Sequence, residues 1–234
     1  LWLMLWQQPI RFAGIVPLIV GFLSLFLTDL PDVLISKEHA ALNGCFNSSL
    51  LPGLKVALKS TYAGRSLSCS ADIDKYNLGD NFDPGKISPD FEGIKISGLL
   101  NANARLSLHN GTIGSAGKIS LEKAVITGEK QALSCENINF NLELTDLLKL
   151  KSAPDQKLTF KTLRIGTIDV YDGTVDFQIE SPEAMLLEKS SFGWCGGHLY
   201  THALRIYTDK KSYRATIFCD GIVLSKMLNE LGVA

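Results

Sequence analysis

The sequence predicts a mainly β protein, in which an N-terminal transmembrane helix precedes an antiparallel sheet and a short helix ends the chain. Three observations support this prediction. Apolar and polar residues alternate along several segments after residue 91, Asn-Gly and Asp-Gly pairs punctuate those segments, and one long uncharged run stands near the N-terminus. Alternation with period two is typical of strands that have one buried and one solvated face.

The uncharged run extends from Phe12 to Thr28, and 11 of its 17 residues are Leu, Ile, Val or Phe. On the membrane-insertion scale these 11 residues contribute very roughly −3 to −7 kcal/mol, which outweighs the cost of Pro17 and Ser24. We therefore interpret the run as a transmembrane helix. A signal peptide and a buried core helix are the alternatives, but the following Asp29 to Asp32 provide no small-residue cleavage site.

The charges beside this run predict its orientation. Arg11 precedes it, whereas Asp29, Asp32 and Glu38 follow it. The positive-inside rule then places the rest of the chain outside the cytoplasm, which in a bacterium with two membranes is the periplasm. Because the sequence starts with Leu1 and not Met, we also consider that it is part of a longer chain.

Residues 37–90 are less regular, and we interpret them as a β-containing connector. Lys55 to Lys59 and Leu67 to Ile73 are candidate strands, whereas Asn77 to Pro89 is rich in Gly, Asp, Asn and Pro and reads as a loop. The predicted organisation is therefore a membrane anchor at 1–36, a connector at 37–90 and a β domain at 91–234.

In the β domain, turn residues recur at intervals of about ten residues, which is the spacing of an all-β fold. Asn110-Gly111 and Asp172-Gly173 are pairs that suit tight hairpin turns. Pro182 ends one strand, and Gly196-Gly197 breaks another.

Two short helical elements are predicted in the same domain. One helical turn is expected at Asp146 to Leu150, closed by Pro154. Near the end of the chain, Ser225 is placed to cap a helix that stops at Gly232. Four apolar residues share one face of that helix: Leu224, Met227, Leu228 and Leu231.

The clearest alternation lies between Leu163 and Tyr207, and it predicts one apolar face. A sheet with one apolar face needs a cover, which is either a second layer, as in a sandwich, or a ligand. The residues expected on this face are Ile168, Val170, Val175, Phe177, Ile179, Phe192 and Trp194.

Composition argues against several functions. A net charge of −1 with scattered basic residues gives no basic stripe for nucleic acid. The sequence holds no G-x-S-x-G, P-loop or HExxH motif, so we expect no enzyme and no cofactor. His198 and His202 stand four residues apart beside Cys195, but on a strand that spacing brings no two ligands together, so we expect no metal site.

The five cysteines are far apart in the sequence, and their odd number excludes complete internal pairing. We expect them to be small buried hydrophobic residues, because unpaired cysteine is among the most buried residue types. They are Cys45, Cys69, Cys135, Cys195 and Cys219.

Two resemblances extend this interpretation. Residues 3–36, LMLWQQPIRFAGIVPLIVGFLSLFLTDLPDVLIS, resemble the end of the membrane region of the ComEC competence family, which takes up single-stranded DNA. The resemblance implies DNA uptake only for a longer parent protein, because it includes none of that family's pore or catalytic parts.

The second resemblance covers about residues 95–234, which are similar to the YdbH branch of the AsmA-like bridge proteins, often labelled a dicarboxylate-transport domain. Several ordered segments support it, and Cys195 departs from the aliphatic or small residue usual at its position. These segments are Asn137-Ile138-Asn139, Leu144 to Gln156, Ile165 to Phe177, Phe192 to Gly197 and Asp220 to Leu228.

This resemblance implies a curled, AsmA-like β groove that transports phospholipid between the membranes and maintains the cell envelope, with acyl chains on the apolar face. The seven residues of that face are then lipid-facing. The implied partners are phospholipid, the inner membrane and outer-membrane or envelope proteins, with the chain anchored in the inner membrane and its β domain in the periplasm. A fragment of a ComEC-type DNA-uptake protein and a structural β domain that binds a protein are the alternatives.

Overall fold

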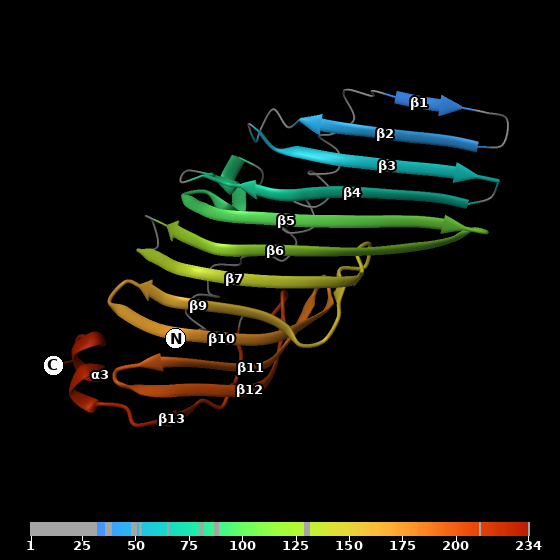
Figure 1. The fold of residues 1–234 in the computed structure, drawn as a ribbon. Coiled ribbons are helices and arrows are strands. Elements are labelled where there is room, and N and C mark those ends of the chain that lie inside the picture. Colours follow the sequence, from blue (N-terminus) through green and yellow to red (C-terminus); the bar gives the residue numbers. More distant parts are fainter. Residues whose placement is uncertain are drawn as a thin grey trace.

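The computed structural model describes residues 32–35, 39–47, 51, 53–64, 66–79, 82–86, 89–128, 132–210 and 212–233. Nearly all of them belong to one antiparallel sheet of 13 strands that is not closed (Figure 1). The prediction of a mainly β, antiparallel fold is therefore confirmed. The predicted transmembrane run at Phe12–Thr28 lies outside the described residues, and none of the described helices is long and apolar enough to span a membrane.

The strands follow one another across the sheet almost in sequence order, with β1 and β13 at its edges; only the short β8 leaves this path and pairs with β7. The strands are β1 (Asp32–Ile35), β2 (His39–Asn47), β3 (Lys55–Ala63), β4 (Ser66–Asn77), β5 (Ile94–His109), β6 (Thr112–Gly128), β7 (Leu133–Asp146), β8 (Lys151–Ser152), β9 (Gln156–Ile165), β10 (Ile168–Ser181), β11 (Ala184–Trp194), β12 (Gly197–Tyr207) and β13 (Phe218–Asp220).

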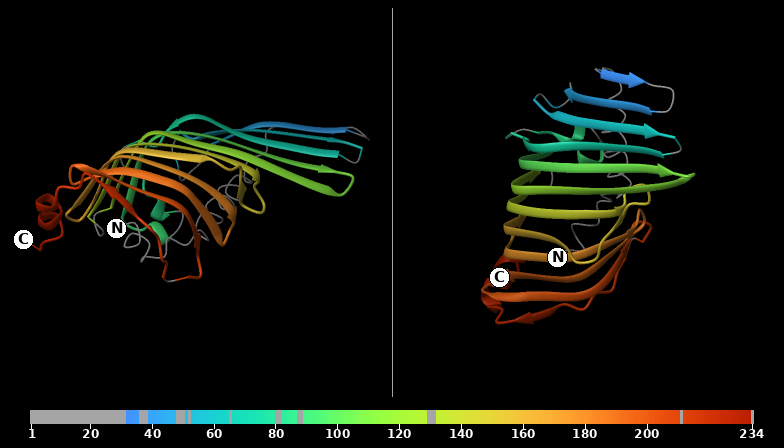
Figure 2. Two further views of the ribbon diagram at one scale, coloured as in Figure 1. Left: turned by 90° about the horizontal axis from the view of Figure 1, so that it is seen from below. Right: turned by 45° about the vertical axis from the view of Figure 1, so that its right-hand side comes forward.

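Within the described residues, three short helical elements accompany the sheet: η2 (Pro84–Lys86), η3 (Pro89–Phe91) and α3 (Leu224–Glu230). Seen from below, the sheet arches, with η2 and η3 beneath the arch and α3 at one end of the strands (Figure 2). Phe82, just before η2, packs against buried residues of the sheet, so the apolar face is the one that the arch turns inward. We call it the inward face and its opposite the outer face.

Positive backbone angles allow the two-residue hairpins. Asn110-Gly111, with φ of 48° and 81°, joins β5 to β6, and Cys195-Gly196, with φ of 48° and 84°, joins β11 to β12. Two consecutive residues with positive φ give a turn whose twist matches that of the flanking strands. The predicted turn at Asn110-Gly111 and the predicted break after Trp194 are confirmed, as is the end of a strand before Pro182.

The strands are longer than the predicted units of about ten residues. β5 has 16 residues, β6 has 17 and β7 has 14. The candidate strands at Lys55–Lys59 and Leu67–Ile73 are confirmed within β3 and β4, and these strands belong to the same sheet as the β domain.

A line of β-bulges crosses the sheet and explains how such long strands keep one apolar face. Along this line the pairing of neighbouring strands is interrupted, and a residue of positive φ lies at the interruption in each of five strands. A bulge adds one residue to a strand, bends it and increases its twist. The residues are Lys75 in β4, Gly98 in β5, Lys123 in β6, Asn137 in β7 and Asp172 in β10.

Each bulge also reverses which residues point inward. In β10, Val170 is buried before the bulge, and Val175 and Phe177, of opposite parity, are buried after it. Asp172-Gly173 is therefore not the predicted hairpin turn but the centre of a continuous strand. That prediction was wrong because positive φ suits both a tight turn and a bulge, and only the pairing with β9 and β11 distinguishes them.

Asparagine side chains bind the backbone at two of these bulges. The Lys75 N–H donates to Asn101 Oδ1 at 2.8 Å, and the Lys123 N–H donates to Asn139 Oδ1 at 3.1 Å. Asn139 Nδ2 in turn donates to the Asn137 carbonyl oxygen at 3.2 Å, so one amide connects two bulges. These bonds replace the ladder hydrogen bonds that the bulges interrupt.

Asn139→Ala is expected to destabilise the sheet by about 1–2 kcal/mol, because it removes both hydrogen bonds of this amide and leaves a bulge N–H without its partner. Urea unfolding followed by circular dichroism measures the change. Asn141→Ala is the control, because Asn141 lies two residues further along β7 and, among the described residues, makes no side-chain hydrogen bond. An equal loss of unfolding free energy in the two variants would show that the hydrogen bonds at the bulges do not stabilise the sheet.

Candidate functional site

The inward face of the sheet is an apolar surface formed by two large clusters of buried side chains. They lie on opposite sides of the bulge line, and Leu158 of β9 packs against both. The first cluster consists of Ala124, Cys135, Ile138, Phe160, Leu163, Val170, Phe192, Trp194, Cys195 and Leu199. The second consists of Leu142, Leu144, Val175, Phe177, Ile179, Met185, Leu187 and Ile206.

All seven residues that the sequence places on the apolar face belong to or contact these clusters. Val170, Phe192 and Trp194 are in the first cluster, and Ile168 packs against it while half-buried. The other three, Val175, Phe177 and Ile179, are in the second cluster. Cross-strand pairing aligns them, because Val170 faces Trp194 on the neighbouring strand.

Most of this surface lies beyond the seven residues predicted from the sequence, and it extends over β7, β9 and β12. Phe160 of β9 closes over Gly173, since a Cβ at Gly173 would lie about 2.0 Å from the Phe160 ring. Phe140 of β7 stacks on Phe177 with ring planes 3° apart and centroids 6.1 Å apart. The alternation in β7 was visible in the sequence, but only the strand order shows that β7 continues the face of β10.

Few of the described segments outside the sheet pack against this face. Ile222 and Met227 contact the first cluster, and Leu147 and Tyr213 contact the second. Tyr213 is fixed by its hydroxyl, which binds the backbone N–H and carbonyl of Tyr207. Each of these contacts is local. Among the described residues, the inward face is therefore covered by short segments and not by a second layer of secondary structure.

Two polar side chains at this surface are used by the fold itself. Ser152 Oγ accepts from the Ile179 N–H at 2.8 Å and donates to the Ala153 carbonyl. Gln156 accepts from the Glu143 N–H and donates to the Pro154 carbonyl at 2.9 Å. Both side chains are buried, and both satisfy backbone groups where β8 interrupts the pairing of β7 with β9.

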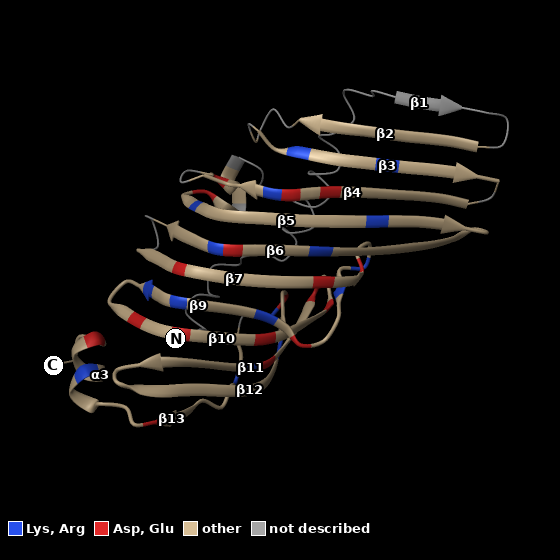
Figure 3. Cartoon of the chain, in the orientation of Figure 1, with Lys and Arg blue, Asp and Glu red and all other residues tan. Residues whose placement is uncertain are grey.

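The outer face carries cross-strand ion pairs, and Figure 3 marks where charged residues lie along the strands. Lys118 pairs with Glu143, Arg164 with Asp169 and Arg205 with Glu180, at 2.6 to 2.9 Å between nitrogen and oxygen. The hydrogen bonds and charge of Arg205 lower the pKa of Glu180, and those of Asp169 raise the pKa of Arg164. These pairs are largely exposed, so they orient the face toward water more than they stabilise the fold.

The structure therefore joins an apolar inward face to a charged outer face on one open, curled sheet, and the comparison with protein families agrees. The family model described as "YdbH-like: Intermembrane phospholipid transport protein YdbH" matches residues 68–233, which is more than half of the chain. The chain belongs to the YdbH-like family. No curated protein and no solved structure matches it significantly.

The YdbH-like match begins at residue 68, within β4, earlier than the resemblance at residues 95–234 suggested. It confirms that resemblance and includes β5 and most of β4. The similarity of residues 3–36 to the ComEC family is not supported by this match and stays a prediction.

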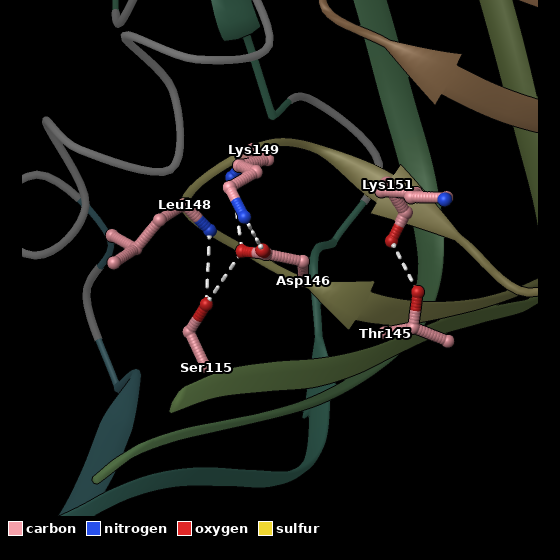
Figure 4. Close-up of polar contacts among 6 residues, drawn as sticks. All are labelled: Ser115, Thr145, Asp146, Leu148, Lys149 and Lys151. Atoms are coloured by element: carbon pink, nitrogen blue, oxygen red, sulfur yellow. Dashed lines mark hydrogen bonds and ion pairs between the residues drawn. The ribbon is translucent and has the colours of Figure 1, made fainter. Parts of the chain in front are cut away.

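One of the YdbH-like segments forms the turn between β7 and β8 (Figure 4). Asp146 accepts from Ser115 Oγ at 2.9 Å and from the Lys149 N–H at 3.1 Å, and it pairs with Lys149 Nζ. These bonds lower the pKa of Asp146, with the Lys149 N–H as the largest cause. The Leu148 N–H donates to Ser115 Oγ at 3.2 Å, while Thr145 Oγ1 donates to the Lys151 carbonyl.

This turn corrects the prediction of a helical turn at Asp146–Leu150. The segment is a hydrogen-bonded turn, and Leu150 has a φ of 47° that no α-helix contains. Its shape places Leu147 and Leu150 against the sheet while Leu148 points to solvent. The apolar spacing of the segment thus serves burial without a helix.

The YdbH-like C-terminal segment forms α3, which docks on the β11–β12 hairpin. Trp194 Nε1 donates to Glu230 Oε2 at 2.7 Å, and Thr167 Oγ1 donates to the Glu230 carbonyl at 2.8 Å. The helix ends as predicted at Gly232, where a φ of 68° and two N–H bonds to earlier carbonyls form a Schellman motif. The predicted cap was wrong, because Val223 and not Ser225 is the N-cap.

The prediction that all five cysteines are buried is confirmed only for Cys135 and Cys195. Cys45 and Cys219 are exposed, and Cys69 is half-buried with its Sγ 3.1 Å from Ser60 Oγ. Burial raises the pKa of Cys135 to about 12, and burial together with the Glu230 carboxylate raises that of Cys195 to about 11. Cys135 is buried because it occupies an inward-facing position of β7.

The histidines of β12 form no metal site with other described residues. No group of three or more His, Cys, Asp or Glu in the described part of the chain is placed to hold a metal ion. The His202 ring instead lies beside Tyr200 and Phe218 on the outer face. The strand predicted there is confirmed as β12, so His198 and His202 are separated along an extended backbone.

Alkylation by iodoacetamide at pH 8 is expected to modify Cys45 and Cys219 at least about 100-fold faster than Cys135 and Cys195, because only the thiolate reacts. A raised pKa keeps the buried thiols protonated at every pH below about 11. Peptide mass spectrometry measures the five rates, and urea, in which all five should react alike, is the control. Equal rates in the folded protein would contradict the burial of the inward face.

Proposed function

We propose that this YdbH-like protein carries phospholipid between two membranes. In this proposal the acyl chains lie on the inward face and the head group stays in water at the edge of that face. The observation that supports this proposal most directly is the bulge line. It reverses strand parity at each crossing, so that inward burial continues on both sides of the bulge in strands as long as β6 and β7. An ordinary short-stranded sandwich needs no such device.

The physical chemistry of the face suits lipid tails. Its side chains are mostly aliphatic or aromatic, with Cys135, Cys195 and Met185 among them. Three of the described polar residues are buried, Ser152, Gln156 and Ser190, and the first two bind backbone groups. Each methylene that leaves water for such a surface contributes about 0.8 kcal/mol. A surface without directional partners binds a chain firmly, yet gives it no fixed stopping point, so a lipid can slide along it.

Access to the face requires movement of its cover. The inward side chains of β10 are buried, so an acyl chain reaches Val175 or Phe177 only when segments that pack there give way. Among the described residues, Tyr213, Ile222 and Met227 are partly buried side chains that pack against the clusters and would have to move. Acyl chains then replace these contacts with apolar ones of the same kind.

The proposal includes the membrane location predicted from the sequence. The uncharged run Phe12–Thr28 would anchor the chain in the inner membrane, and the acidic residues after it would place the sheet in the periplasm. Membership in a family of intermembrane phospholipid transport proteins supports this arrangement. The proposal assigns the protein no reaction, and the two thiols of the inward face, Cys135 and Cys195, are buried with raised pKa values.

Photo-crosslinking tests the proposal in the full chain. The photoreactive residue p-benzoylphenylalanine replaces Phe177 on the inward face or Tyr171 on the outer face of the same strand, β10. Both natural residues are aromatic, so the substitutions are matched in size. After irradiation in membranes, mass spectrometry is expected to find phospholipid attached at position 177, about tenfold above position 171.

Other outcomes would reject the groove. Equal lipid attachment at the two positions would mean that detergent or bulk lipid reaches both faces. A protein crosslink at position 177 without lipid would favour the structural alternative, in which a partner covers the sheet. Thermal unfolding of both variants shows whether either substitution has disrupted the fold.

A further inference from the structure

The exposed apolar side chains of the described residues gather near the C-terminus. Ten large hydrophobic residues are exposed, and seven of them lie between residues 200 and 233. Single exposed apolar residues are normal on protein surfaces, whereas a group of this kind marks an interaction site. The seven are Tyr200, Ile217, Phe218, Val223, Leu224, Leu231 and Val233. We call them the C-terminal apolar patch.

Helix α3 supplies the centre of this patch because its apolar stripe is only partly used by the fold. The sequence predicted that Leu224, Met227, Leu228 and Leu231 share a face. Met227 packs against the first apolar cluster, whereas Leu224 is 62% exposed and Leu231 is 46% exposed. A helix whose apolar stripe is wider than its contact with the sheet has surface left for another partner.

Hydrogen bonds to two neighbouring hairpins fix the orientation of α3. Glu230 accepts from the Trp194 indole through its carboxylate and from Thr167 through its backbone carbonyl. The Val223 N–H donates to the Cys195 carbonyl at 3.0 Å. These bonds hold both ends of the helix against the β9–β10 and β11–β12 hairpins, in a position that leaves Leu224 and Leu231 exposed.

Strand β13 adds aromatic side chains to the same region. Phe218 stacks on Tyr200 with centroids 5.2 Å apart and planes 12° apart, and His202 lies edge-on to Tyr200 at 5.8 Å. Tyr, whose ring has an apolar body and a polar tip, is enriched where a protein meets the boundary between water and lipid.

We propose that the C-terminal apolar patch is a membrane-docking surface, on which Leu224, Leu231 and Val233 enter the acyl boundary of a bilayer. The inference rests on the proposed lipid transport. The observation that selects a bilayer is continuity: Ile222 and Met227 pack against the first cluster of the inward face, and Val223, Leu224 and Leu231 of the same C-terminal segment belong to the patch. A lipid at this end of the face therefore meets apolar side chains without a break up to the bilayer.

Docking of this type is shallow. A seven-residue helix lies in the plane of the interface and does not span the membrane. Lys226 and Glu230 belong to the same helix and offer both charge signs, so the contact depends on apolar burial more than on anionic lipid. Binding is therefore expected to change little when salt is raised.

Hydrogen–deuterium exchange tests the proposal in the full chain, because it reports on residues 217–233 separately from any membrane contact near the N-terminus. The probe is a vesicle made of equal parts phosphatidylethanolamine and phosphatidylglycerol. In the natural sequence, vesicles are expected to slow amide exchange in residues 217–233 by about tenfold. The double variant Leu224→Gln and Leu231→Gln should lose this protection.

Leu148→Gln is the matched control. Leu148 is also 62% exposed and receives the same chemical change, but it lies in the β7–β8 turn outside the patch. This variant should keep full protection of residues 217–233. Circular dichroism of each variant without vesicles confirms that α3 and the sheet are intact.

Two outcomes would overturn the docking surface. If vesicles leave exchange in residues 217–233 unchanged in the natural sequence, the patch does not meet lipid, even when photo-crosslinking at position 177 still shows lipid on the inward face. If protection instead rises with protein concentration in the absence of vesicles, a second copy of the chain covers the patch. If no lipid is crosslinked at position 177 but vesicles still protect residues 217–233 from exchange, the groove is rejected and the docking surface is retained.

Discussion

The reversal of strand parity at the bulge line is the constraint on which the other features of this protein depend. A flat strand of 14 to 17 residues with strict alternation would drift out of step with neighbours that twist and curve. Extra residues at Lys75, Gly98, Lys123, Asn137 and Asp172 bend the sheet and restore inward burial beyond the bend. Two clusters of apolar side chains thereby form one surface.

Part of this architecture could be predicted because it is local. Alternation identified β7, β10 and β12, and the chemistry of Asn110-Gly111 and Gly232 located a hairpin and a helix end, since positive φ needs particular residues. The interpretation of Asp172-Gly173 failed for the same reason. A tight turn and a bulge favour the same residues. Which of the two forms depends on pairing with strands β9 and β11, which are not part of the local sequence pattern.

The candidate site shows the same division between local and distant information. The inward positions of β10 and β11 followed from alternation, but Phe160, Leu187 and Ile206 belong to the surface only because β9, β11 and β12 are neighbours in the sheet. The apolar stripe of α3 was visible in the sequence as well. Its partition into a half-buried Met227 and an exposed Leu224 depends on where the helix docks, which Glu230 and Trp194 determine across 36 residues.

The contact between Glu230 and Trp194 also makes the end of the inward face and the C-terminal apolar patch one mechanical unit. Trp194 lines the first apolar cluster, and its indole N–H binds the helix that presents Leu224 and Leu231. Under the proposed function, a lipid chain that displaces Met227 from the cluster would move α3 and strain the bonds that tie the helix to Trp194, Thr167 and Cys195. Loading of the face and the position of the patch would then be coupled through these three bonds, of which the Trp194–Glu230 bond is charge-assisted.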